Sequence, residues 1–66
     1  MNNSDNTVRH NYRQLTDAEK SQMVLLKDHG LAFIQACRAI GTSRELSLAI
    51  TKAEEAVMWG VKHITQ

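Results

Sequence analysis

The chain has 66 residues, one cysteine, eight basic and seven acidic side chains, and a formal net charge of +1 at pH 7. A domain this small usually needs a disulfide, a metal or self-association, and because Cys37 is alone and His10, His29 and His63 lie far apart, we expect self-association and no cofactor. The near-neutral charge disfavours long nucleic acids as partners, and the lack of a signal core or a long apolar run predicts a cytoplasmic protein without a membrane span.

The N-terminal residues are mostly asparagine, serine and other polar types. They predict a flexible tail over residues 1–8, followed by a single domain over residues 9–66. The domain opens with a short basic and aromatic cluster around Tyr12. This ring can stack on a base, and the neighbouring Arg9 and Arg13 offer forked donors for phosphate. The alternative is an ordinary polar lead-in segment in which Tyr12 covers apolar residues.

The first long helix is predicted from Asp17 to about Ala39. Thr16 and Glu19 have the spacing of a capping box, in which each side chain accepts a hydrogen bond from the other residue's amide. Six residues at alternating steps of three and four then form an apolar seam, namely Met23, Leu26, Gly30, Phe33, Cys37 and Ile40. Glycine on the seam permits a close approach of a second helix, or else marks a kink.

The second helix is predicted from a capping box over Thr42–Glu45 to the C-terminus, directly after Gly41 ends the first helix. Its seam consists of Leu46, Ile50, Ala53, Val57, Gly60 or Val61, and Ile64. We therefore predict an all-α antiparallel helical hairpin. A second apolar stripe needs a partner, either another copy of the chain or a different protein, and comprises Leu25, Ile34, Leu48, Ala49, Ala56 and Trp59.

Two cations on the predicted helices are candidate anion-binding residues. Lys27 lies beside the first seam, although most helical lysines are simply solvated. Arg44 falls in the first turn of the second helix, where a positive side chain opposes the helix dipole unless an anion compensates it. The alternative for Arg44 is a salt bridge with the adjacent Glu45, or with Glu19 or Asp17.

Catalysis and DNA readout are both disfavoured. Glu54 and Glu55 point about 100° apart on a helix, so they do not form a facing carboxylate pair. The Cys37 thiol on an apolar seam stays protonated and inert, and we predict that the protein is not an enzyme. Residues 36–44 superficially match a helix-turn-helix, but Ser47 stands where a recognition helix needs an apolar residue. A small RNA- or DNA-binding hairpin, or an adaptor protein, remains the alternative function.

Three stretches carry a resemblance to a known family: Tyr12-Arg13-x-Leu15-Thr16-x-x-Glu19-Lys20, Lys27-Asp28-x-Gly30-x-x-Phe33, and Ser43-Arg44-Glu45-Leu46-Ser47-Leu48-Ala49-Ile50-Thr51-Lys52-Ala53-Glu54-Glu55-Ala56-Val57-Met58-Trp59. With these motifs the chain resembles the helical-hairpin cyclic-oligonucleotide sponges of bacteriophages. These anti-CBASS proteins sequester second messengers of the infected host. The resemblance runs over nearly the whole chain, and the last stretch is its most specific part.

The resemblance implies a compact homohexamer in the host cytoplasm that binds cyclic nucleotides without hydrolysing them. It implies that Tyr12 and Lys27 bind cyclic dinucleotides such as cyclic GMP-AMP. At separate sites, Arg44 would bind cyclic trinucleotides, with a contribution from Arg13. The family often has a neutral amide at the position of Arg13, so this residue departs from the family pattern.

Overall fold

The computed structural model describes residues 14–66, so the predicted tail at residues 1–8, Tyr12 and Arg13 all lie outside the described residues. Thr16 caps the first helix, α2 (Asp17–Ile40). Its hydroxyl accepts a hydrogen bond from the Glu19 amide at 3.0 Å, and the Glu19 carboxylate accepts one from the Thr16 amide at 2.9 Å. These two bonds confirm the first predicted capping box. They satisfy two backbone donors that a helix start otherwise leaves unpaired.

The second helix, α3 (Arg44–Thr65), begins after Ser43, whose hydroxyl accepts a hydrogen bond from the Leu46 amide at 3.0 Å. The capping box predicted over Thr42–Glu45 is therefore wrong. With Ser43 as the cap, the third helical residue is Leu46, whose side chain has no acceptor to return the bond. The start of α3 thus has a single side-chain cap.

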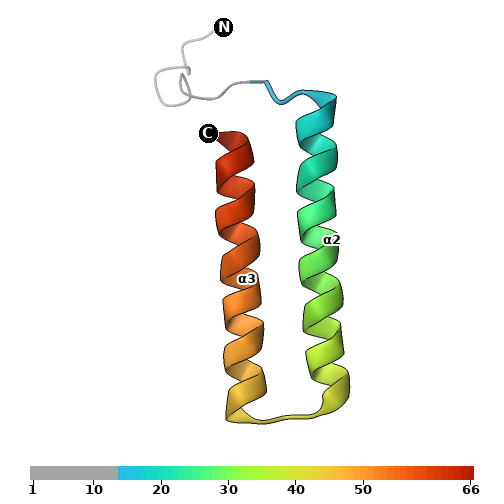
Figure 1. Ribbon diagram of the computed structural model, residues 1–66, viewed down its shortest axis with the longest axis vertical. Coiled ribbons are helices and arrows are strands. Elements are labelled where there is room, and N and C mark those ends of the chain that lie inside the picture. Colours follow the sequence, from blue (N-terminus) through green and yellow to red (C-terminus); the bar gives the residue numbers. More distant parts are fainter. Residues whose placement is uncertain (1–13) are drawn as a thin grey trace, which may run out of the picture.

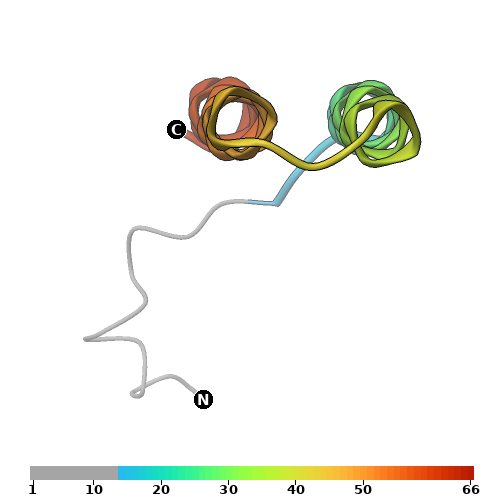
Figure 2. The same ribbon diagram turned by 90° about the horizontal axis from the view of Figure 1, so that it is seen from below.

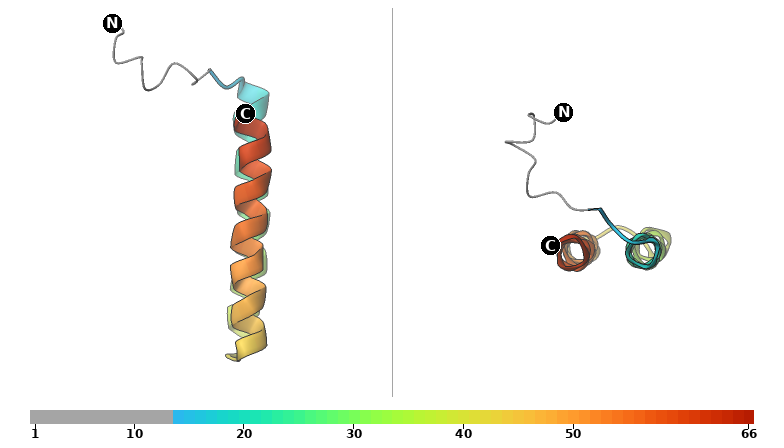
Figure 3. Two further views of the ribbon diagram at one scale, coloured as in Figure 1. Left: turned by 90° about the vertical axis from the view of Figure 1, so that its left-hand side faces the viewer. Right: turned by 90° about the horizontal axis from the view of Figure 1, so that it is seen from above.

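The two helices run antiparallel and side by side, joined by the short connection 41–43 (Figure 1). Viewed along the helices and edge-on, they form one layer, and within residues 14–66 no other element covers either side (Figure 2 and Figure 3). The predicted two-helix antiparallel hairpin is confirmed. A helix-turn-helix is excluded, because its two helices cross at about 90–120°. Neither α2 nor α3 has an apolar stretch sufficient to cross a membrane.

The contact between α2 and α3 follows the predicted seam closely on α3 and less closely on α2. Every predicted seam residue of α3 is buried or half-buried. On α2, Met23 and Leu26 are half-buried and Cys37 is buried, but Phe33 is 52% exposed and Ile40 is 76% exposed.

Ile34, which we had assigned to the outer stripe, is instead buried at 8% exposure. A straight helix has 3.6 residues per turn, so the buried line drifts from a strict heptad and passes through Ile34 rather than Phe33. The other large members of that stripe, Leu25, Leu48 and Trp59, are exposed as predicted.

Two glycines bring the helices together. A Cβ atom placed on Gly30 would collide with Val57 Cγ2, and one on Gly60 would lie 2.8 Å from Leu26 Cδ1. Each helix thus offers a glycine to a branched side chain of the other. The close approach expected at Gly30 is confirmed, with α2 continuous through this residue.

Candidate functional site

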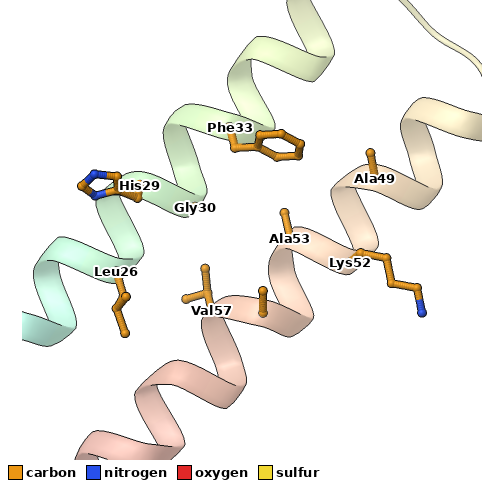
Figure 4. Close-up of a pocket in the computed structure, with 9 residues that line it drawn as sticks. Leu26, His29, Gly30, Phe33, Ala49, Lys52, Ala53 and Val57 are labelled. Carbon is orange, nitrogen blue, oxygen red and sulfur yellow. The ribbon is translucent and has the colours of Figure 1, made fainter.

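One side of the hairpin carries an apolar groove of about 520 Å³ between the helices (Figure 4). Val57 points from α3 towards Leu26 and Gly30, while the Lys52 side chain extends away from α2. The groove is lined by Leu26, His29, Gly30, Phe33, Ala49, Lys52, Ala53, Ala56 and Val57. The Nδ1 atom of His29 donates to the Leu25 carbonyl at 2.9 Å, which leaves Nε2 without its proton in the neutral ring. This side suits an apolar partner rather than an anion.

Lys27 lies on the opposite side, in a second groove of about 270 Å³ that we call the Lys27 groove. It is lined by Lys27, Gly30, Leu31, Ile34, Glu54 and Val57. The two grooves share only Gly30 and Val57, which form the contact between the helices, so the remaining residues of each groove lie on opposite sides of the pair. Lys27 is exposed and forms no ion pair within residues 14–66. Its ammonium is available to an external anion.

A third groove, which we call the turn groove, lies where the helices meet the connection and has a volume of about 590 Å³. Its lining is part polar and part apolar, and four of the lining residues carry a hydroxyl group. The lining residues are Arg38, Gly41, Thr42, Ser43, Leu46, Ser47, Ile50 and Thr51. Arg38 follows Ile34 of the Lys27 groove by one helical turn, and Glu54 of that groove follows Thr51 in the same way. The turn groove and the Lys27 groove therefore lie on the same side of the hairpin.

Arg44 is exposed in the first turn of α3, as predicted. It forms no ion pair within residues 14–66, so the alternative of a salt bridge with Glu45 is not observed among them. The acidic residues Asp17 and Glu19 lie at the start of α2, at the other end of the hairpin from the turn. The suggestion that either carboxylate is near Arg44 was wrong, because antiparallel packing places them more than about 30 Å of helix away.

The structure keeps the candidate residues Lys27 and Arg44 apart. Lys27 precedes Ile40, the end of α2, by 13 residues, which corresponds to about 20 Å along the helix. Arg44 lies beyond that end, after the connection. One protomer therefore cannot bring both cations to the same phosphate of a small ligand. Tyr12 and Arg13, the other two candidates, are outside the described residues.

Sequence reasoning missed Arg38 and Glu54 as groove residues, since these grooves form only where α2 and α3 pack against each other. The adjacent glutamates have different surroundings, as predicted: Glu54 lines the Lys27 groove, whereas Glu55 pairs with Lys52 at 3.7 Å. Trp59 is exposed on the outside of α3, with the Lys62 ammonium 5.8 Å from its ring centroid. No cluster of potential metal ligands occurs in the part of the chain that the structure describes.

Comparison of the sequence with known protein families identifies the family of this chain. Residues 4–65 match the family described as Acb2/Tad1, hairpin domain. The chain belongs to the Acb2/Tad1 hairpin domain family. This is the phage family of nucleotide sponges directed against the CBASS and Thoeris defences, and its members are non-catalytic. The resemblance inferred from the sequence motifs is thereby confirmed.

The Acb2/Tad1 match includes the positions of all four candidate residues, Tyr12, Arg13, Lys27 and Arg44. The family is described as a hairpin domain, in agreement with the two helices of this structure. Comparison with curated proteins and with solved structures gave no significant match.

Proposed function

We propose that this protein is a non-catalytic sponge that sequesters cyclic di- and trinucleotide second messengers in the host cytoplasm and so blocks CBASS signalling. Membership of the Acb2/Tad1 hairpin family over residues 4–65 is the observation that carries the proposal. Lys27 and Arg44, which form no ion pair within residues 14–66, support it, because a phosphodiester needs cationic partners.

In this proposal the cyclic dinucleotide is bound by Tyr12 and Lys27. Such a ligand has two phosphates related by an approximate two-fold axis. A two-fold interface between copies would supply the ring and the ammonium twice, one pair for each half of the ligand. Stacking contributes about 1–3 kcal/mol per base, and each charge-assisted contact contributes about 1.5–3 kcal/mol. The Lys27 ammonium is exposed and forms no ion pair in the described part of the chain, which supports this role.

In this proposal the cyclic trinucleotide is bound by Arg44, with a contribution from Arg13. Three phosphates require three equivalent cations around a three-fold axis, and three copies of the chain would supply them. The guanidinium of Arg44 is exposed and, within residues 14–66, has no carboxylate partner to compete with a phosphate. Its separation from Lys27 by about 20 Å of helix fits two kinds of site that bind different ligands without competition.

A homohexamer, which has both kinds of axis, is the assembly that we propose. Only Ile34, Cys37 and Ile64 are buried hydrophobic residues within residues 14–66. Large apolar side chains are exposed instead, including Phe33 in the apolar groove. A single hairpin this exposed needs further apolar contacts, and copies of itself can supply them.

Isothermal titration against cyclic GMP-AMP and cyclic tri-AMP tests the proposal. Tyr12→Ala and Lys27→Ala should each weaken cyclic GMP-AMP binding by about tenfold or more, because each removes a stacking or charged contact. Arg44→Gln should instead weaken cyclic tri-AMP binding. Lys20→Gln removes one exposed charge near the start of α2 and serves as the control, with both affinities unchanged. Unchanged cyclic GMP-AMP affinity in both Tyr12→Ala and Lys27→Ala would contradict the assignment of the dinucleotide site.

The same samples distinguish a sponge from the other function classes. Ligand released by heating should be chemically intact by chromatography, since sequestration breaks no bond. Native mass spectrometry should show a hexamer that carries both ligand classes at once. A dimer that binds RNA or DNA with a steep salt dependence would instead support the alternative of a nucleic-acid-binding hairpin.

A further inference from the structure

The turn groove joins a cation from one helix to hydroxyl groups of the other. Arg38 contributes from the last turn of α2, and Ser47 and Thr51 contribute from α3. Leu46 and Ile50 provide an apolar floor. A guanidinium with neighbouring hydroxyls over an apolar surface can bind a phosphate together with the sugar or base attached to it.

Arg44 stands on the same side of α3 as these hydroxyls. Ser47 follows Arg44 by three residues and Thr51 follows it by seven, so all three share one helix face. Arg38 therefore lines the turn groove from α2, and Arg44 lies on the face of α3 from which Ser47 and Thr51 line it. Within residues 14–66 neither guanidinium forms an ion pair, and Glu45 points about 100° around the helix from Arg44.

The turn groove is locally positive, although the chain as a whole has a net charge of only +1. At the turn end the groove is lined by a cation and by neutral polar groups, with no acidic residue in its lining. The acidic residue nearest along this side, Glu54, lines the Lys27 groove instead. An anion bound between the Arg38 and Arg44 guanidiniums would be attracted by both of them.

We propose that Arg38 is a further phosphate-binding residue, and that the turn groove holds one phosphodiester unit of the cyclic trinucleotide between Arg38 and Arg44. This inference rests on the trinucleotide site of the proposed function and adds a residue to it. Arg38 provides a forked pair of N–H donors, while Ser47 and Thr51 bond to the sugar or base of the same unit. Three protomers then place six guanidiniums around three phosphates, rather than three.

Isothermal titration of the full-length Arg38→Gln protein tests the inference, with cyclic tri-AMP and cyclic GMP-AMP as probes. Arg38→Gln should weaken cyclic tri-AMP by roughly tenfold or more while leaving cyclic GMP-AMP unchanged, because Lys27 precedes Arg38 by about three helical turns along α2. Arg38→Lys should recover only part of the affinity, since an ammonium keeps the charge but loses the fork. Lys20→Gln, at the far end of α2, controls for the loss of one positive charge.

Each result separates this inference from the function on which it rests. If Arg44→Gln weakens cyclic tri-AMP and Arg38→Gln does not, the inference is wrong while the trinucleotide site stands. If Arg38→Gln weakens both ligands equally or changes the assembly mass, Arg38 has a structural role and the inference is again wrong. Failure of the unchanged protein to bind any cyclic trinucleotide overturns the inference together with that part of the proposed function.

Discussion

Two glycines determine how closely the helices of this hairpin pack, and they do so by different contacts. Gly30 faces Val57, and Gly60 faces Leu26. Val57 is β-branched and has little freedom to turn away at χ1, whereas the end of Leu26 can move by rotation. The two positions should therefore respond differently to the same substitution, although alanine favours a helix over glycine at both.

Gly30→Ala should lower the free energy of unfolding by about 1–2 kcal/mol, because overpacking against Val57 exceeds the gain in helix propensity. Gly60→Ala is the matched control and should change it by less than about 1 kcal/mol. Chemical denaturation at one fixed protein concentration measures both. Gly30→Ala should lower the free energy of unfolding by less in a Val57→Ala protein than in the unchanged protein, because the colliding methyl group is then absent. A Gly30→Ala protein more stable than the unchanged chain would contradict the close contact.

At the scale of the element, α2 and α3 begin with different caps. The α2 start has a reciprocal pair of bonds between Thr16 and Glu19, and the α3 start has one bond from the Leu46 amide to Ser43. Thr42 precedes that cap and makes no capping bond to α3. The neighbouring hydroxyl residues Thr42 and Ser43 therefore form a natural pair for comparison.

Ser43→Ala should reduce the free energy of unfolding by about 1 kcal/mol, the usual effect of removing an N-cap. Thr42→Ala should change it by only a few tenths of that amount, since the residue lies outside the cap. Thermal unfolding followed by circular dichroism at constant protein concentration provides the measurement. The reverse order of effects would place the start of α3 at Thr42, as the sequence pattern alone had indicated.

The helices could be predicted from the sequence because their signals are local. The Thr16–Glu19 spacing, the glycine at 41 and the apolar periodicity each lie within a few residues. The rotation of α2 about its own axis was harder to predict, since Phe33 and Ile34 are adjacent and both apolar. Which of them is buried depends on the contact at Gly30, and that contact exists only after the chain has turned back on itself.

The residues of the candidate site likewise divide into those that the sequence could predict and those that only the structure reveals. Lys27 and Arg44 were identified from their positions on the predicted helices, and the family motifs supplied their ligand roles; both signals are visible in a linear sequence. Arg38 was not, because nothing near it in the chain distinguishes it from an ordinary helix-terminal cation. Its position opposite Ser47 and Thr51 arises from antiparallel pairing across the connection.

At the scale of the whole molecule, the single layer of two helices leaves both sides exposed. The few buried residues lie along one line of contact, and the apolar groove adds Phe33 to the exposed surface. Stability of such a chain should depend on association, and therefore on concentration.

We expect the midpoint of thermal unfolding to rise by about 5–10 °C when the protein concentration increases 100-fold. Phe33→Glu should abolish most of this rise and lower the mass seen by light scattering, because it places a charge in the apolar groove. Gln35→Glu adds the same charge at an exposed position elsewhere on α2 and is the control. A midpoint independent of concentration in the unchanged protein would mean that one hairpin is stable by itself.

The antiparallel course of the chain also has a practical consequence. Gln66 follows α3 at the end of the hairpin remote from residues 41–43 (Figure 1). An affinity tag or fluorophore attached after Gln66 would be separated from the turn by about 33 Å of helix, the length of the 22 residues of α3. Immobilised through this end, the protein would present Arg38 and Arg44 to solution, so that messengers could be captured and counted on a surface.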